Sequence, residues 1–247
     1  MIWLQRGLAW GLAWLRSAFF MLGLALVTPI YAVLALMTFP LPPLVRYRLI
    51  SGWSYLMLWW LRVTCGIRYR LIGAENIPST PSIILAKHQS AWETLAFQQI
   101  FPPQVWVLKR ELLRVPFLGW GLAMTSPIAI DRSAGREALK QMVAQGKDRL
   151  GQGFWVVIFP EGTRMAPGKK GKYHIGGAWL ASHTKTDVVP VAHNAGEFWG
   201  KNSFVKKPGT ITVSIGQPIP STGLATDDLN RMVETWIESE MEHLAQR

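Results

Sequence analysis

The segment 87–93 places a histidine and a carboxylate where an apolar strand pattern gives way to a helical one. Histidine titrates near neutral pH and can accept a proton from a hydroxyl, so His88 is a candidate general base. Glu93 follows five residues later, an offset that would hold the two side chains about 140° apart in one continuous helix. They can meet only if the helix begins between them, and Ser90 has the side chain of an N-cap. Glu93 could then orient the imidazole and stabilise its protonated form.

The same spacing has a purely structural interpretation. Ser90 and Glu93 have the Ser-x-x-Glu pattern of a capping box, in which the glutamate accepts a hydrogen bond from the backbone of the N-cap residue. A single histidine at the end of a strand is also more often structural than catalytic. Spacing alone leaves the catalytic and the capping interpretations open.

A second segment, 159–164, reads Phe-Pro-Glu-Gly-Thr-Arg and follows the most apolar strand pattern. Gly162 permits a positive φ, and backbone N–H groups in such a turn can bind an anion. Arg164 can hold a phosphate in a bidentate manner. An ordinary turn with a solvated arginine is the alternative.

Further cations directly follow apolar strand patterns. Lys109 and Arg132 stand at such positions, and several cations at strand ends could converge on one phosphate. The alternative interpretation is that each of them is a separate surface charge. The lysines of two loops, 169–172 and 206–207, are interpreted as solvated charges.

Several catalytic signatures are absent from the sequence. It contains no Gly-x-Ser-x-Gly nucleophile elbow, no His-Glu-x-x-His zinc motif and no Walker A loop. Its single cysteine, Cys65, lies in an apolar region where a thiolate is disfavoured. A reaction that fits this inventory is direct attack by a substrate hydroxyl on an activated acyl thioester.

These residues need a scaffold that brings strand ends together. From residue 67 onward, short β-branched or aromatic runs alternate with helical stretches, which predicts an α/β domain with a central sheet flanked by helices. The strands are expected at 67–72, 82–86, 105–108, 128–130, 154–159, 188–192 and 210–215. The helices are expected at 91–100, 134–150, 175–183 and 227–244. Such folds place ligands beyond the strand ends.

The composition points to a polyanionic or membrane partner. The 247 residues carry a net charge of +11, and only 17% are charged while 49% are hydrophobic. Such a positive excess suits nucleic acid, a membrane surface or a phosphorylated substrate. The 13 tryptophans favour a membrane interface.

The N-terminal region is predicted to be a membrane anchor. No residue from Ser17 to Val45 is charged, and about 20 such residues can span a bilayer as a helix. A signal peptide is the alternative, although its apolar region is usually only about 7–15 residues long. A second apolar segment, 53–66, is short for a span. Two apolar helices joined by a proline-rich turn could form a shallow hairpin, and a single transmembrane span is the alternative. Pro29 would kink the first helix, which favours the hairpin. We therefore expect an anchor at 1–66 and an α/β domain at 67–247.

Four blocks of the sequence resemble those of the 1-acyl-sn-glycerol-3-phosphate acyltransferases. Residues 87–93 are similar to Asn-His-x-Ser-x-x-Asp, 130–132 match Ile-Asp-Arg, 159–164 match Phe-Pro-Glu-Gly-Thr-Arg in full, and 188–191 resemble an apolar run around a proline. The resemblance covers about residues 70–220. Lys87 stands where the family usually has Asn, Glu93 where it has Asp, and Ser126 and Ala129 where Gly and Phe are common.

The resemblance implies an α/β acyltransferase that makes phosphatidic acid from lysophosphatidic acid. It implies His88 as general base with Glu93 as its partner. The implied substrate-binding residues are Lys109, Arg132, Glu161, Gly162, Thr163 and Arg164. No metal or cofactor is expected; the donor would be acyl-CoA or acyl carrier protein. The partners would be these substrates and a lipid bilayer, without nucleic acid.

The resemblance also implies a membrane location, and we expect the cytoplasmic membrane with the catalytic domain on its cytoplasmic side. Two alternatives remain for the function. One is an acyltransferase for glycerol-3-phosphate or another lysophospholipid; the other is a non-catalytic basic protein that binds membranes.

Overall fold

The computed structural model describes residues 2–246, except for the side chains of residues 2–6, 8 and 132. A seven-stranded sheet with the strand order β1-β7-β6-β2-β5-β3-β4 forms its centre. The strands are β1 (Ile67–Ile72), β2 (Ile83–Ala86), β3 (Gln104–Lys109), β4 (Ile128–Ile130), β5 (Trp155–Ile158), β6 (Val188–His193) and β7 (Gly209–Ile215). The expected α/β class is thus confirmed, and each strand lies within two residues of its predicted bounds.

Five consecutive strands of the sheet are parallel. Strands β6, β2, β5, β3 and β4 pair in parallel, whereas β7 runs antiparallel to β6 and carries β1 alongside it in parallel. Parallel neighbours need crossover connections, which the helices supply. The carboxyl ends of β6, β2, β5, β3 and β4 therefore meet at one edge of the sheet.

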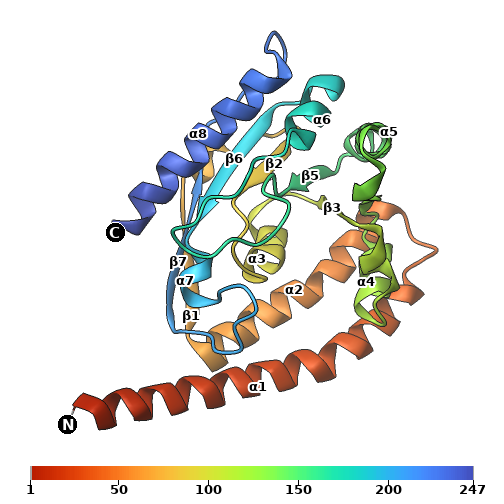
Figure 1. Cartoon of the computed structure of the whole chain (residues 1–247). Coiled ribbons are helices and arrows are strands. Elements are labelled where there is room, and N and C mark those ends of the chain that lie inside the picture. The colour runs from red at the N-terminus through yellow and green to blue at the C-terminus, as the bar shows by residue number, and fades with distance from the viewer. Residues whose placement is uncertain (1, 247) are drawn as a thin grey trace.

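Helices cover both faces of the sheet (Figure 1). They are α1 (Ile2–Met37), α2 (Pro43–Cys65), α3 (Trp92–Ile100), α4 (Leu118–Met124), α5 (Arg136–Gly151), α6 (Gly176–Thr184), α7 (Ala195–Phe198) and α8 (Thr226–Ala245). Short 3-10 turns lie at Ala74–Asn76, Arg110–Arg114 and Arg132–Ala134. The prediction missed α4, whose Gly119 and Gly121 lower its helix propensity.

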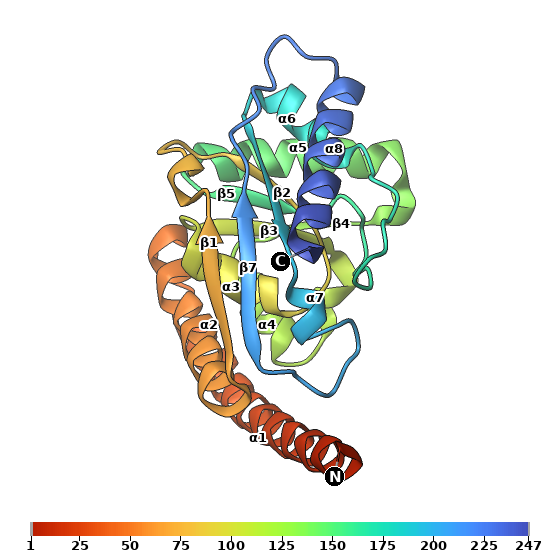
Figure 2. The same cartoon turned by 90° about the vertical axis from the view of Figure 1, so that its left-hand side faces the viewer.

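Strand β2 shows how the two faces form separate cores. Ile84 and Ala86 pack with residues of α1, α2 and α3, whereas Ile83 and Leu85 pack with residues of α5, α6 and α8. All four are buried, as expected of a central parallel strand whose side chains alternate between two covered faces. Figure 2 shows the opposite placement of α3 and α8 about the sheet.

The N-terminal helices form a hairpin that packs on the domain. Helix α1 runs unbroken past Pro29 and lies along the outside of α2 (Figure 1). Helix α2 begins at Pro43, ten residues before the apolar segment that the sequence suggested. Because Leu61 and Cys65 of α2 are fully buried in the core beneath the sheet, α2 is part of the domain as well as part of the hairpin.

Lys206 fastens α1 to the loop between α7 and β7. Its backbone N–H donates to Ser17 Oγ at 2.8 Å, and its ammonium group lies 5.4 Å from the ring centroid of Phe20 and 4.9 Å from that of Trp199. Lys206 is only 1% exposed, so the interpretation of this lysine as a solvated charge was wrong. Burial lowers its pKa, and the aromatic faces stabilise the cation that remains.

Candidate active site

The predicted site residues gather at the edge where the five parallel strands end. His88 follows β2, the segment 159–164 follows β5, Lys109 ends β3, and Arg132 follows β4. These strands are adjacent in the sheet, so their carboxyl ends face the same side. This edge is where open α/β sheets place ligands.

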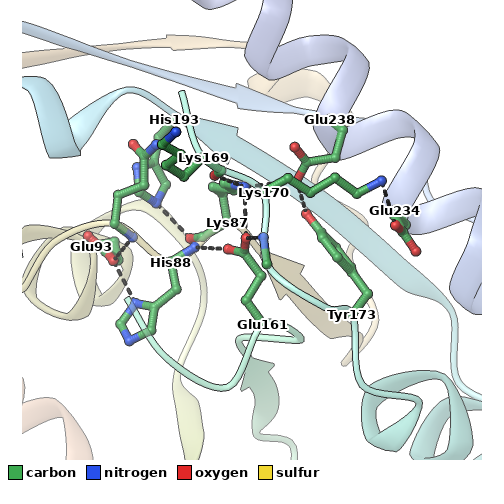
Figure 3. Close-up of polar contacts among 12 residues, drawn as sticks. Lys87, His88, Glu93, Glu161, Lys169, Lys170, Tyr173, His193, Glu234 and Glu238 are labelled. Carbon is green, nitrogen blue, oxygen red and sulfur yellow. Dashed lines mark hydrogen bonds and ion pairs between the residues drawn. The ribbon is translucent and has the colours of Figure 1, made fainter. Parts of the chain in front are cut away.

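His88 and Glu93 are in direct contact, because α3 begins between them. Nδ1 of His88 lies 2.8 Å from Oε1 of Glu93 (Figure 3). The helix starts at Trp92, and the residues before it are outside the helix, which removes the angular separation of a continuous helix. The predicted condition for a His–carboxylate pair is therefore met.

The capping interaction is present as well, on the same carboxylate oxygen. Oε1 of Glu93 accepts hydrogen bonds from the backbone N–H groups of Gln89 at 3.0 Å and Ser90 at 2.8 Å. Ser90 Oγ accepts from the N–H of Trp92 at 3.0 Å and not from that of Glu93, and Ala91 is the N-cap of α3, so only the glutamate half of the predicted capping box is present. The two interpretations of Glu93 are thus compatible: the cap fixes the carboxylate that contacts His88.

Glu93 is fully buried and is held as a carboxylate. Burial acts to raise the pKa of Glu93, but nearby His193, the His88 hydrogen bond and the Ser90 N–H lower it below its usual value. His193 is itself buried, which lowers its pKa, and its Nε2 lies 2.9 Å from the carbonyl oxygen of Lys87. The second oxygen of Glu93, Oε2, makes no hydrogen bond with the described residues.

The imidazole of His88 is held flat against Phe159. The two ring centroids lie 3.9 Å apart at an interplanar angle of 8°, and Phe159 stacks in turn on Trp106 at 5.7 Å. The stack fixes the plane of the imidazole ring and therefore the directions in which Nδ1 and Nε2 point. This role of Phe159 was not predicted, although its place at the end of the strand beside β2 could have suggested it.

The backbone of His88 is clamped by the loop after β5. Its N–H donates to Oε2 of Glu161 at 3.3 Å, and its carbonyl oxygen accepts from the N–H of Met165 at 2.7 Å. Nε2 makes no hydrogen bond among the described residues, and the side chain is 16% exposed. His88 is thus fixed at its backbone, ring face and Nδ1, while Nε2 stays open.

Glu161 faces the interior of the protein. Its side chain is fully buried, and Oε1 lies 2.8 Å from Nζ of Lys87 and accepts from the N–H of Gly171 at 2.9 Å. Both carboxylate oxygens are engaged by Lys87, Gly171 and the His88 N–H, so Glu161 lies beside His88 and holds its backbone (Figure 3).

The other predicted binding residues are more open. Arg164 is partly exposed, and its guanidinium makes no hydrogen bond or ion pair with the side chains that the structure describes. Lys109 is exposed and equally uncommitted within the same residues. Thr163 Oγ1 accepts from Lys201 at 3.4 Å, and Gly162 has a φ of 67° that allows the tight turn. The side chain of Arg132 lies outside the described part of the chain.

Ser126, which stands where Gly is common, has a φ of 58°. This left-handed conformation is costly for most residues other than Gly. Arg46 of α2 donates to its Oγ at 2.9 Å, and Arg149 donates to its carbonyl oxygen at 2.8 Å. These two contacts support a conformation that Gly would adopt without help.

The fold and this strand-edge site are those of an acyltransferase. Residues 68–194 match the family model described as "Acyltransferase", and the chain belongs to this family. It is 44% identical over 236 residues to the 1-acyl-sn-glycerol-3-phosphate acyltransferase of Pseudomonas aeruginosa, covering 94% of this chain and 92% of that protein.

A more distant relative carries the same name, and one solved structure shares the fold. The 1-acyl-sn-glycerol-3-phosphate acyltransferase of Saccharomyces cerevisiae is 33% identical over 189 residues, which cover 70% of this chain and 59% of that protein. The crystal structure of the 1-acyl-sn-glycerophosphate (LPA) acyltransferase PlsC from Thermotoga maritima has the same fold, with a TM-score of 0.78 at 22% identity. That match covers 94% of this chain and 96% of that chain.

Proposed function

We propose that this chain moves a fatty acyl chain from an acyl thioester to the free hydroxyl of 1-acyl-sn-glycerol-3-phosphate, giving phosphatidic acid. The observation that carries the proposal is the pair of His88 and Glu93 at 2.8 Å, with Nε2 of the histidine uncommitted among the described residues. The 44% identity to an enzyme with this name supports the choice of acceptor.

The contacts of His88 support its role as general base. A carboxylate at Nδ1 accepts a hydrogen bond from it, so the proton resides on Nδ1 and the lone pair on Nε2. Nε2 takes the proton of the acceptor hydroxyl as its oxygen attacks the thioester carbonyl. When the carbon–sulfur bond breaks, the leaving thiolate takes this proton from Nε2 of His88. Glu93 stabilises the imidazolium that exists between these two steps.

The acceptor phosphate is assigned to the cations at the same edge. Arg164 has five N–H donors in a planar fork that matches two phosphate oxygens. Lys109 adds a point charge, Arg132 follows the next strand, and Thr163 adds a hydroxyl group at the turn that Gly162 shapes. Glu161 acts indirectly here, by holding the His88 backbone.

The membrane-binding surface is assigned to the outer face of α1. The most apolar 18-residue stretch between Ala9 and Met37 has a mean hydropathy of 2.3, and this part of α1 is long and apolar enough to cross a bilayer. Yet Ser17, Phe20, Ala32 and Ala35 are buried against the protein, so α1 is docked between Ser17 and Ala35. A helix docked in this way lies in the membrane surface with its free apolar face toward the lipid.

This arrangement suits residues 1–66 as an anchor that holds the site at the membrane surface. The acceptor and product can then remain in the bilayer while the strand edge works on the head group. The donor is acyl-CoA or acyl carrier protein, with no further cofactor. The location proposed is the cytoplasmic membrane, with the catalytic domain on its cytoplasmic side.

An acceptor panel tests the proposal. Purified protein in detergent is given one acyl thioester with lysophosphatidic acid, glycerol-3-phosphate or lysophosphatidylcholine, and products are read by mass spectrometry. Phosphatidic acid should form fastest. Faster acylation of glycerol-3-phosphate or lysophosphatidylcholine would reassign the acceptor, and no product from any of them would leave only a membrane-binding role.

A further inference from the structure

A fully buried lysine lies beside His88 and points to the opposite face of the sheet. The strand alternation of β2 continues past its end, so His88 turns toward α3 and Lys87 toward α8. The ammonium group of Lys87 lies 2.8 Å from Oε1 of Glu161, 2.8 Å from Oε1 of Glu238 and 3.2 Å from the carbonyl oxygen of Lys169 (Figure 3). These three acceptors use all three of its N–H donors.

The two carboxylates connect this lysine to different parts of the protein. Glu161 reaches the backbone N–H of His88 with its other oxygen, at 3.3 Å. Glu238 comes from α8, and its Oε1 also accepts from the hydroxyl of Tyr173 at 2.6 Å. Burial and the neighbouring Glu238 raise the pKa of Tyr173, so this phenol remains a donor. A continuous path of contacts therefore runs from α8 to the backbone of His88.

The geometry points to Glu238 as a positioning residue for the acyl transfer proposed above. Glu238 shares the Lys87 ammonium with Glu161 and thereby fixes where that ammonium lies. Its position in turn sets the orientation of the Glu161 carboxylate that holds the His88 N–H. Glu238 touches no substrate in this assignment and acts through Lys87 and Glu161.

The identity of residue 87 makes this inference sharp. Lys87 stands where the resembling family usually has Asn, which carries no charge. With Asn at this position, Glu161 and Glu238 would face one another without the cation that separates them, and two such carboxylates repel. Glu238 is therefore the partner that Lys87 requires. Replacing Lys87 by a neutral residue should be tolerated only if Glu238 is neutralised as well.

A double-substitution cycle tests the coupling with Lys87→Asn, Glu238→Gln and both changes combined. Glu234→Gln is the matched control, because Glu234 lies one helical turn earlier on α8 and pairs with Lys170 at 2.7 Å without contacting Lys87. Each protein is assayed for turnover with lysophosphatidic acid and an acyl thioester, and the rate is divided by the folded fraction from circular dichroism. Both KM values are measured.

The expected pattern is specific to positioning. Lys87→Asn alone should lower kcat per folded enzyme by about 10- to 100-fold with little change in donor KM, because misplacement of the base affects the chemical step. Adding Glu238→Gln should restore kcat by about fivefold or more over the single variant, since contacting residues couple. Glu234→Gln should keep the kcat of the unchanged enzyme.

Two other results would overturn the inference. Unchanged kcat per folded Lys87→Asn enzyme would show that the network serves stability alone. A combined variant no better than Lys87→Asn would show that Glu238 does not act through Lys87. An unchanged enzyme that forms no phosphatidic acid would instead reject the proposed function, so the two failures are distinguishable.

Discussion

Oε1 of Glu93 lies 2.8 Å from Nδ1 of His88 and is also the acceptor for two backbone N–H groups of the turn that joins them. One oxygen atom thus closes the turn before α3 and fixes the imidazole. The arrangement makes the local fold and the proposed chemistry depend on the same carboxylate. Substitutions at Glu93 can separate these two contributions, because amide and carboxylate differ in charge more than in shape.

Glu93→Gln should lower turnover by at least about tenfold, because an amide cannot stabilise the imidazolium of His88 as an anion does. It should also cost about 1–3 kcal/mol of stability, since the amide NH2 group would lie buried where Oε2 has no partner among the described residues. Glu93→Asp keeps the charge and should retain more activity than the Gln variant. Turnover assays and melting curves on both variants check this. Near-normal turnover of the Gln variant would reduce Glu93 to a helix cap.

The pH dependence of stability gives a second test of Glu93. Its pKa in the folded protein lies below the ordinary value of 4.5. The ionised carboxylate therefore stabilises the fold above about pH 4.5, and this contribution disappears as the pH falls through the folded pKa. The unfolding free energy of the unchanged protein minus that of Glu93→Gln should shrink on acidification, as denaturant titrations between pH 7 and pH 3 can measure. A difference that grows toward low pH would contradict the assignment.

Arg164→Ala should weaken use of the acceptor more than use of the donor. The lost charged hydrogen bonds cost about 1.5–3 kcal/mol, or roughly 10- to 150-fold in kcat/KM for the acceptor. Arg164→Lys is the control that keeps a charge without the planar fork, and it should recover only part of the loss. If only the donor KM rises in the Ala variant, Arg164 contacts the thioester substrate.

The free face of α1 should control membrane binding. Leu26 is 60% exposed and Ile30 is 64% exposed, and each contributes about 1.5–3 kcal/mol when removed from water. Changing both to Lys should lower partitioning into lipid vesicles by about 100-fold while the melting temperature stays unchanged. Met232→Lys, on the exposed face of α8, is the control and should partition normally. Unchanged partitioning of the double variant would show that another surface binds the membrane.

Much of the fold could be predicted from the sequence because its signals are local. Each β-branched run, such as Ile128–Ile130, predicts a strand without information from the rest of the chain, and Ser90 indicates where α3 begins. The same holds for the meeting of His88 and Glu93, which depends only on where one helix begins. Residues 1–66 are harder to separate from the domain than the sequence suggested, since α2 supplies buried core residues such as Leu61.

What could not be predicted depends on contacts between distant parts of the chain. The burial of Lys206 requires Phe20 and Trp199, which only the docked α1 and α7 bring together. Lys87 is 151 residues from Glu238 in the sequence, and no local pattern around either residue predicts that the two are in contact. The inward direction of Glu161 follows from the same buried lysine. The motif at 159–164 singles out Glu161 but does not indicate the direction in which the Glu161 side chain points.

The proposed acyl transfer depends on His88 as the general base. The direct measurement is the turnover of His88→Ala with lysophosphatidic acid and an acyl thioester. Turnover is monitored by release of the thiol and by mass spectrometry of the product. The variant should fold and bind vesicles like the unchanged protein, while its rate falls by about 10²- to 10⁴-fold. Retention of more than half of the original rate would contradict the mechanism.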